Sequence, residues 1–449
     1  MPETTRVPPF DPLQKRFRKE QEVTGKQPWR SWKALATLIG VVATVAVGYV
    51  ATTATAKSHA DVTLRVSLFG DFGYHDLYKQ FEAAHPGVTI KEELQAYPDH
   101  HSALAQHVAT GAGAADVEAI EVGFIAQFTA APQNFVDLRE FGASGVKSRW
   151  LPWKYAQAVA RNGAVIGLGT DVGSLAICYR KDLFARAGLP SQRDAVSKLW
   201  PTWQAFIAAG KRFQAKAPAG VKFLDSGSNL YNAVIAQANP AYYDAAGKVI
   251  ASTNAKVKSA WALTMQAVTG GIDAGYPAFS NDWNTGFKKG TFATVTCPAW
   301  MMGYIQGQAP ATKGKWDIAA VPGTGGNWGG SFLAVPKQSG NRELAAELAK
   351  FLTSPAAESF VFKQTGNLPS QPALLRSPAV QGFRNAFFSN APVGKIFANS
   401  ALRLRPQILG PHQGDFQNAA SQAIQRVEQK KQSANSSWSQ FLKDVKRYS

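Results

Sequence analysis

The hydrophobic pattern becomes regular at residue 61. Up to residue 70, apolar side chains recur at every second position (Val62, Leu64, Val66 and Leu68), which predicts a β-strand with one buried face. An amphipathic segment follows, a Pro-Gly pair interrupts it, and residues 88–92 are predicted to form a second strand. This order predicts a β-α-β unit with parallel strands and a right-handed crossover.

Similar patterns continue through the rest of the chain. Short apolar runs predict strands at 117–122, 174–180, 291–296, 316–321 and 331–335. Helical periodicity predicts helices at 97–110, 203–215, 256–269, 342–352, 354–364, 416–428 and 438–446. Strands that alternate with helices are typical of an α/β protein. Because 449 residues are too many for one ordinary core, we expect two lobes.

Two tryptophans stand out in the stretch 290–337. Trp300 follows a predicted strand, and Trp328 lies inside a glycine-rich bend at 323–330. Glycine lets a backbone bend and approach a ligand closely, and an indole at such a junction offers a flat apolar face. Sugar rings have apolar faces and hydroxyl-rich edges, so this stretch favours a carbohydrate ligand.

Polar residues at strand ends are the second group of candidates. In parallel sheets, ligands bind beyond the carboxyl ends of the strands. Glu121 closes the apolar run at 117–122, and Phe72 lies in the loop after the first strand. Glu121 has two interpretations: a solvent-exposed carboxylate at a strand edge, or an acceptor for a ligand hydroxyl. Asp171 precedes the strand at 174–180 and is a comparable candidate.

The helix at 97–110 carries three histidines. His100 and His107 are seven residues apart and share a helix face. A metal site needs a third ligand of suitable geometry, and the sequence shows none. We therefore expect a solvated helix face, no metal and no cofactor.

The N-terminus differs from the rest of the chain. Residues 1–33 are polar, basic and proline-bearing, and we expect a disordered cytoplasmic tail. Residues 34–56 carry no charge and are long enough to span a bilayer of about 30 Å. They form either an uncleaved transmembrane signal anchor or a signal peptide cut near Ala56. Both interpretations place the remainder outside the cytoplasm, and we favour the anchor because the preceding tail is long.

Charge adds little to this picture. The formal net charge is +18, but the basic residues after the tail are scattered and accompany no nucleic-acid-binding module. We expect a basic surface that faces an anionic cell envelope and no nucleic acid.

Six motifs, taken in order, resemble the extracellular solute-binding proteins of carbohydrate ABC transporters, the group that includes maltose-binding protein. The motifs are LFGDFGYHDLYKQFEAAHPGVTI, ADVEAIEVGF, GSLAICYRKDLFARAGLP, GTFATVTCPAWM, WGGSFLAVPKQS and AAELAKFLTSPAAESFVFKQTGNLPSQPAL. The resemblance covers about residues 60–449, and it depends on all six motifs together.

This resemblance implies an α/β, two-lobe periplasmic-binding-protein-like fold of type II. Each lobe is expected to hold a mixed, mainly parallel sheet flanked by helices, and a hinge joins the lobes. The N-terminal lobe would comprise 60–169 plus 328–370, and the C-terminal lobe 171–326 plus 373–449. Three crossings are expected near 169–173, 326–330 and 367–372, with the ligand in the cleft.

The resemblance also implies residue roles. Trp300 matches the family's ring-stacking tryptophan, and Glu121 and Asp171 match its polar contacts. The segment NWGG places Asn327, Trp328 and Gly329 at the cleft. Phe72, Asp225 and Trp283 are carried over on less specific motifs.

The implied function is that of the carbohydrate-binding component of an ABC importer. Such a protein captures a disaccharide or short oligosaccharide by hinge closure, delivers it to the permease subunits and performs no chemistry. A β-linked glucose disaccharide is the sugar we favour. A membrane-anchored sugar sensor or lectin-like binder is the alternative. A glycoside hydrolase is a third class, but it needs a pair of carboxyl groups across the scissile bond, which the sequence does not indicate.

The chain departs from the family's Gram-positive pattern at the anchor. Many such members carry a lipid-modified cysteine after the signal peptide, whereas the first cysteine here is Cys178. This difference favours the uncleaved anchor, and it leaves sensing open. Cys178 and Cys297 are the only cysteines, and outside the cytoplasm they either form a disulfide or remain two buried thiols.

Overall fold

The computed structural model describes residues 61–448. The expected tail at 1–33 and the apolar segment at 34–56 lie outside these residues. Within 61–448, no helix combines the length and the apolar character needed to cross a bilayer. The described residues belong to one compact unit.

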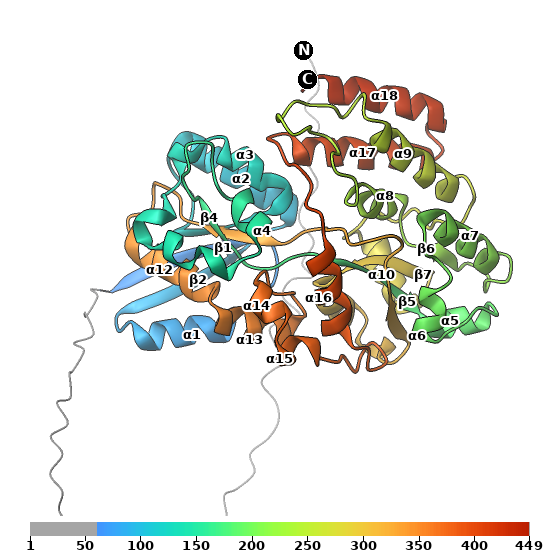
Figure 1. Cartoon of the computed structure of the whole chain (residues 1–449), viewed down its shortest axis with the longest axis horizontal. Helices are drawn as coiled ribbons and strands as arrows, with labels where there is room; N and C mark the ends of the chain where they lie inside the picture. Colours follow the sequence, from blue (N-terminus) through green and yellow to red (C-terminus); the bar gives the residue numbers. More distant parts are fainter. Residues whose placement is uncertain (1–60, 449) are drawn as a thin grey trace, which may run out of the picture. The chain divides into compact units, whose positions relative to one another are not determined.

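The first sheet has five strands in the order β2-β1-β3-β9-β4. Their bounds are β1 Val62–Leu68, β2 Val88–Leu94, β3 Val117–Glu121, β9 Ser331–Ala334 and β4 Gly167–Gly169. Helices cover both faces (Figure 1): α1 His75–Ala84, α2 Tyr97–Thr110, α3 Val122–Thr129, α4 Pro152–Gln157 and α12 Arg342–Leu352. The expected β-α-β unit is present, because β1 and β2 pair in parallel with Val62 opposite Val88.

The second sheet has four strands in the order β6-β7-β5-β8. Their bounds are β6 Lys222–Leu224, β7 Phe292–Pro298, β5 Leu175–Arg180 and β8 Trp316–Ala319. The helices of this part before β9 are α5 Lys181–Arg186, α6 Arg193–Ser197, α7 Trp203–Gln214, α8 Gly227–Ile235, α9 Ala255–Val268, α10 Asn281–Lys289 and α11 Met301–Gln308. Cys178 in β5 and Cys297 in β7 form a disulfide, with their Cα atoms 5.4 Å apart and both side chains fully buried.

Both sheets are mixed, as expected, but their pairings are not mainly parallel. In the first sheet, β9 runs antiparallel to both β3 and β4. In the second, β5 runs antiparallel to β7 and β8, and only β6 and β7 are parallel. The reason is that β9 enters the first sheet from the other lobe's side, so its direction opposes that of β3.

Three segments connect the two sheets and lie side by side. Asp171 forms a β-bridge with Pro369, and Ser174 forms one with Asn327. The amide of Val172 donates to the carbonyl of Leu368 at 2.9 Å. The first of the three expected crossings is therefore in direct backbone contact with each of the other two.

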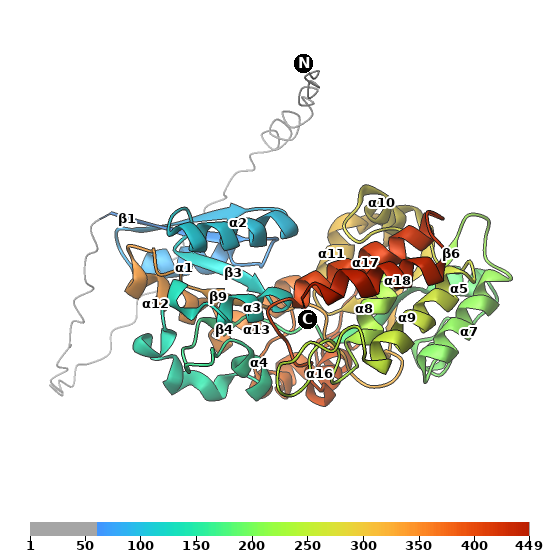
Figure 2. The same cartoon turned by 90° about the horizontal axis from the view of Figure 1, so that it is seen from above.

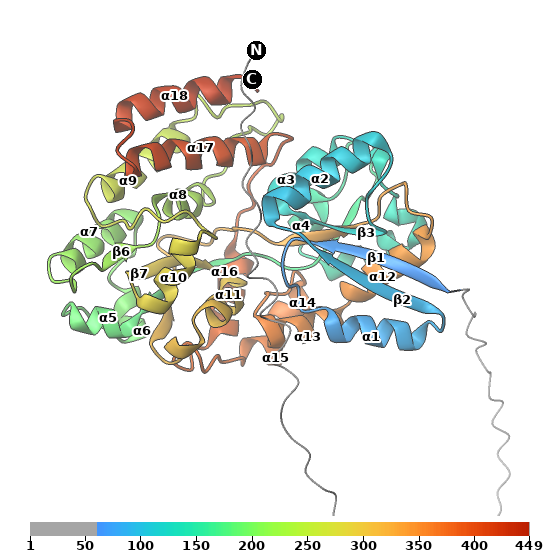
Figure 3. The ribbon, with the colours of Figure 1, turned by 180° about the vertical axis from the view of Figure 1, so that it is seen from behind.

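From Pro355 to Lys446 the named elements are helices only. They are α13 Pro355–Thr365, α14 Pro372–Leu375, α15 Pro378–Gln381, α16 Val393–Arg403, α17 Gln413–Glu428 and α18 Ala434–Lys446. Helix α17 packs on α8 and α18 of the second-sheet side, and its first turn also contacts α3 of the first-sheet side (Figure 2). The view from behind shows β1 and β2 on one side and α10 and α11 on the other (Figure 3).

Candidate functional site

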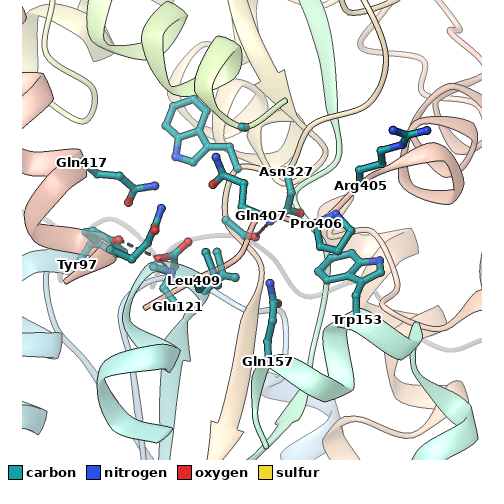
Figure 4. Close-up of a pocket in the computed structure, with 16 residues that line it drawn as sticks. Tyr97, Glu121, Trp153, Gln157, Asn327, Arg405, Pro406, Gln407, Leu409 and Gln417 are labelled. Atoms are coloured by element: carbon teal, nitrogen blue, oxygen red, sulfur yellow. Dashed lines mark hydrogen bonds between the residues drawn. The ribbon is translucent and has the colours of Figure 1, made fainter. Parts of the chain in front are cut away.

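A cavity lies where α17, the second crossing and the first-sheet side meet (Figure 4). Its empty volume is about 520 Å³, which includes space open to solvent. The residues that line it are Tyr97, Glu121, Val122, Gly123, Trp153, Gln157, Ala236, Asn327, Trp328, Gly329, Arg405, Pro406, Gln407, Leu409, Gln413 and Gln417. Four of the residues expected from the sequence are among them: Glu121, Asn327, Trp328 and Gly329.

Glu121 is held at the point where β3 ends and α3 begins. Its side chain caps α3, because the amide of Gly123 donates to Oε2 at 2.6 Å. The hydroxyl of Tyr97 donates to the same oxygen at 3.1 Å. Burial raises the pKa of Glu121 to about 7, although these two hydrogen bonds favour the ionised form. Oε1 takes part in neither bond, so it can accept from a ligand.

Two of the three histidines of α2, His100 and His101, are buried, so the expectation of a solvated helix face is wrong for them, and His101 supports Glu121. His100 and His101 are each only 1% exposed. Nε2 of His101 accepts from the backbone amide of Glu121 at 3.0 Å, and Nδ1 bonds the carbonyl of Tyr97 at 2.9 Å. Burial lowers the pKa of His101 to about 3, so the ring is neutral. The His101 ring is packed between aromatic neighbours: it stacks on Phe124, with centroids 4.1 Å apart, and meets Phe69 at a tilt.

Tryptophan faces form the apolar part of the site. Trp328 lies in the second crossing and Trp153 in α4, and both are partly buried. The amide of Trp328 donates to the carbonyl of Gly173 at 2.8 Å, which fixes the position of its backbone. A Cβ on Gly173 would lie 1.7 Å from the carbonyl oxygen of Trp328, so only glycine allows this approach.

Trp300 does not line the cavity but contacts Trp328 from behind. Trp300 lies between β7 and α11, at the N-cap of α11. Its Nε1 donates to the carbonyl of Trp328 at 3.0 Å. The ring centroids of the two indoles are 5.6 Å apart. Gly329 has a φ of +87°, and a side chain there would collide with the Trp300 ring. The two tryptophans singled out from the sequence are therefore neighbours.

Amide side chains supply the open hydrogen-bonding groups of the cavity. Oε1 of Gln157, Oδ1 of Asn327 and Oε1 of Gln413 are buried and have no hydrogen-bond partner among the described residues. The Gln413 side chain is 2% exposed. Buried acceptors without a donor are costly, so a hydroxyl-rich ligand fits this cavity.

Asp171 lies in the first crossing and bonds the start of β9. Its Oδ1 accepts from the amide of Ser331 at 2.9 Å and from the hydroxyl of Thr170 at 2.7 Å. Burial raises its pKa, and the nearby Lys154 opposes that change. Lys154 is buried with Nζ 3.8 Å from the ring centroid of Phe332, and burial lowers its pKa to about 8. Asp171 thus stabilises the junction and does not line the cavity.

The structure does not bring the other three candidates to the cavity. Asp225 and Trp283 are fully buried, and Nε1 of Trp283 donates to Oδ2 of Asp225 at 2.7 Å. Phe72 is 9% exposed and packs against Phe69 in the core of the first-sheet side.

Several cavity residues were not predicted from the sequence: Tyr97, Trp153, Gln157, Arg405, Gln407, Gln413 and Gln417. The last four lie within a glutamine-rich segment, residues 405–417. This composition is the one local signal in the sequence that could have indicated a polar binding surface. Among the described residues, no group of three His, Cys, Asp or Glu side chains is arranged to hold a metal ion.

Comparison with known proteins decides the family. The family described as bacterial extracellular solute-binding protein matches residues 76–386, which is more than half of the chain. The chain belongs to this family. Its members are binding proteins, and membership implies that the folded part acts outside the cytoplasm.

Two curated relatives carry names that refer to sugars. The chain is 28% identical over 300 residues to an arabinooligosaccharide-binding protein of Bacillus subtilis (strain 168), a match that spans 62% of this chain and 65% of that protein. It is 27% identical over 210 residues to a lactose-binding protein of Rhizobium radiobacter, which spans 45% of this chain and 48% of that protein. The matched part thus covers just under two thirds and about half of these relatives.

Solved structures confirm the fold expected for the family. A crystal structure of an extracellular solute-binding protein of family 1 is 43% identical, with a TM-score of 0.77, and the match covers 86% of this chain and 99% of that one. The ABC-transporter-associated binding protein of B. animalis subsp. lactis Bl-04, solved with β-1,6-galactobiose, has a TM-score of 0.75 at 20% identity and covers 87% and 98% of the two chains. The solute-binding chain therefore has the type II periplasmic-binding-protein fold.

Proposed function

We propose that this solute-binding protein is the carbohydrate-binding component of an ABC importer. It takes a disaccharide or short oligosaccharide into the cavity between the two sheets, closes on it and presents it to the permease subunits. The observation that carries the proposal is the make-up of the cavity. Tryptophan faces (Trp153, Trp328) stand beside buried acceptors without partners (Gln157, Asn327, Gln413). The similarity to arabinooligosaccharide- and lactose-binding proteins, and to a binding protein solved with β-1,6-galactobiose, supports it.

Each part of the cavity has a role in this proposal. An indole face covers the apolar face of a sugar ring, while hydroxyl groups donate to the amide oxygens and to Oε1 of Glu121. Glu121 is the single carboxylate among the described residues that line the cavity. Hydrolysis by the usual pair of carboxyl groups would need a second one across the scissile bond.

Two finer points belong to the proposal. The lobes would comprise 60–169 plus 328–370 and 171–326 plus 373–449, joined at the three crossings. Residues 34–56 would keep the chain on the outer face of the membrane as an uncleaved anchor, or be cleaved near Ala56.

Calorimetry on the full chain tests the binding function. The panel comprises arabinobiose, arabinotriose, lactose, cellobiose and β-1,6-galactobiose, and we expect saturable binding of at least one sugar with no cleavage product on chromatography. Trp328→Ala should weaken that binding by about 1 to 3 kcal/mol, since the stacking face is lost.

The matched control is Trp438→Ala, because Trp438 packs on Trp261 away from the cavity. It should change the affinity little. A panel with no binding sugar would refute the proposed function, and cleaved product would replace it with hydrolysis.

A further inference from the structure

Charge is divided unevenly between the two proposed lobes. In the lobe at 171–326 plus 373–449, Lys and Arg outnumber Asp and Glu by more than two to one. In the lobe at 60–169 plus 328–370, acidic residues are slightly in excess. The positive charge of the folded part therefore belongs to the lobe of the second sheet. A cleft beside charge of one sign concentrates ligands of the opposite sign.

Arg405 brings this positive charge to the cavity. It follows α16, lines the cavity and has an exposed side chain. It forms no hydrogen bond or ion pair with another described residue. Glu121 is the single carboxylate among the described residues that line the cavity, and Figure 4 shows it on the opposite side from Arg405. The guanidinium therefore stands at the edge of the ligand space without a counter-ion from the described part of the chain.

The backbone that carries Arg405 is fixed by its neighbours. The carbonyl of Pro406 accepts from Nδ2 of Asn239 at 2.8 Å. Nε2 of Gln407 donates to the carbonyl of Ile235. The guanidinium thus extends from a held segment, so an anion that binds it restricts little more than the rotamers of one side chain.

An aromatic face lies beside this cation. Trp153 of α4 also lines the cavity, and Figure 4 shows its indole below Arg405 and next to Pro406. In a uronic acid, a carboxylate at the edge of the sugar ring replaces the hydroxymethyl group. Such a ring can place its apolar face on an indole and its carboxylate on a guanidinium, which binds carboxylates through two parallel hydrogen bonds.

We infer that Arg405 is a specificity-determining residue that binds a carboxylate of the sugar, so that the ligand class is acidic oligosaccharides containing a uronic acid. The inference rests on the proposed carbohydrate-binding function and refines it by naming the class of sugar. Glu121, on the other side of the cavity, accepts from hydroxyl groups of a neighbouring ring. The two charges of the protein thus contact different parts of one ligand.

Matched pairs of disaccharides test this class on the full chain. Calorimetry at pH 6 and low salt compares cellobiose with cellobiouronic acid, and α-1,4-galactobiose with digalacturonic acid. The acidic member of at least one pair should bind at least tenfold more tightly than its neutral partner. This preference should shrink as salt is added, because salt screens the interaction between charges. At pH 6 Glu121 is largely neutral and repels the acidic sugar little.

The role of Arg405 is tested by three variants. Arg405→Gln should lower the affinity for the acidic sugar roughly ten- to a hundredfold and leave the neutral partner within about twofold. Arg405→Lys keeps the charge without the two parallel donors and should keep part of the preference. Arg403→Gln is the matched control, because Arg403 is also exposed but does not line the cavity, and it should change neither affinity. All three variants should keep the wild-type melting temperature.

Equal affinities within each pair would refute the acidic class while the proposed function stands. An Arg403→Gln variant that loses as much of the preference as Arg405→Gln would overturn the role of Arg405, since the charge of the whole lobe would then be the cause. Equal weakening of both members of a pair by Arg405→Gln would also overturn it, because Arg405 would then bind a hydroxyl group. A wild-type chain that binds neither these pairs nor the neutral panel would refute the inference and the proposed function together.

Discussion

At the scale of single residues, the site combines one carboxylate that is bonded through a single oxygen with amide oxygens that have no partner among the described residues. Glu121 is this carboxylate, and both of its donors bond Oε2. The buried and neutral His101 fixes the backbone of Glu121 from behind. The side chain is therefore oriented before any ligand arrives, which reduces the cost of binding.

The protonation of Glu121 should control affinity. Its pKa is raised to about 7, so the carboxyl is largely neutral at pH 6 and largely ionised at pH 8. An ionised oxygen is the stronger acceptor for a sugar hydroxyl. Affinity for a neutral sugar should therefore rise between pH 6 and pH 8.

Titration calorimetry across this range, with the sugar that binds best, measures the effect. Glu121→Gln should bind more weakly at pH 8 and show a flat profile, while the melting temperature shows that it stays folded. The His101 ring, with a pKa of about 3, stays neutral throughout and contributes no slope. A wild-type affinity that falls over the same range would contradict this role for Glu121.

Single residues were predicted where a local signal exists. Glu121 ends a buried strand and Trp328 lies among glycines, and both signals are visible in the sequence. Asp225 also follows a short strand, yet its side chain is buried and accepts from Trp283. The local sequence pattern of Asp225 is the same as that of Glu121, so it does not distinguish the two residues. Gln157 and Gln413 come from helices far apart in the chain, so only the tertiary fold brings them together.

At the scale of elements, the long periodic segments were predicted closely. Helix α2 has the expected bounds, and β3, β7 and β9 lie within one to two residues of theirs. The three-residue strand β4 and helix α16 were not predicted, because β4 is too short to show a period. Parallel pairing was overestimated because the direction of β9 depends on a crossing, which strand periodicity does not report.

The disulfide between β5 and β7 should stabilise the second sheet. It joins cysteines 119 residues apart, and closing a loop of that length is worth about 4 to 5 kcal/mol in the chain-entropy model. A variant with Cys178→Ala and Cys297→Ala should lose most of that free energy of unfolding in urea titration.

Wild-type protein titrated with urea in the presence of a reductant should unfold at the same lower urea concentration as the variant without the two cysteines. The oxidised wild type should give no free-thiol signal when denatured without reductant. Equal midpoints with and without the reductant would show that the disulfide contributes no stability.

At the scale of the whole molecule, the cavity depends on how the crossings meet. The backbones of Gly173 and Trp328 are in direct contact, so the first crossing sets the position of an indole in the second. Family resemblance indicated where the chain crosses, whereas periodicity and composition did not. Contact between the crossings is a property of the tertiary fold that no local pattern encodes.

Gly173→Ala tests this coupling between the crossings. The added methyl group would overlap the carbonyl of Trp328, so we expect a stability loss of about 1 to 3 kcal/mol and weaker sugar binding. Gly145→Ala is the matched control, since its Cβ would meet no atom within 4 Å. Thermal melting and calorimetry measure the two effects, and unchanged binding by Gly173→Ala would show that the crossing does not position Trp328.

Helix α17 adds a consequence for biosynthesis. Its first turns carry Gln413 and Gln417, while Tyr97 and Glu121 were added to the growing chain some three hundred residues earlier. Ribosomes make proteins from the N-terminus, so the wall opposite Glu121 is absent until this late helix has been translated. Sugar therefore cannot act as a folding template for a nascent or C-terminally truncated chain, and a cell producing such fragments would gain no ligand-dependent protection of them from proteolysis.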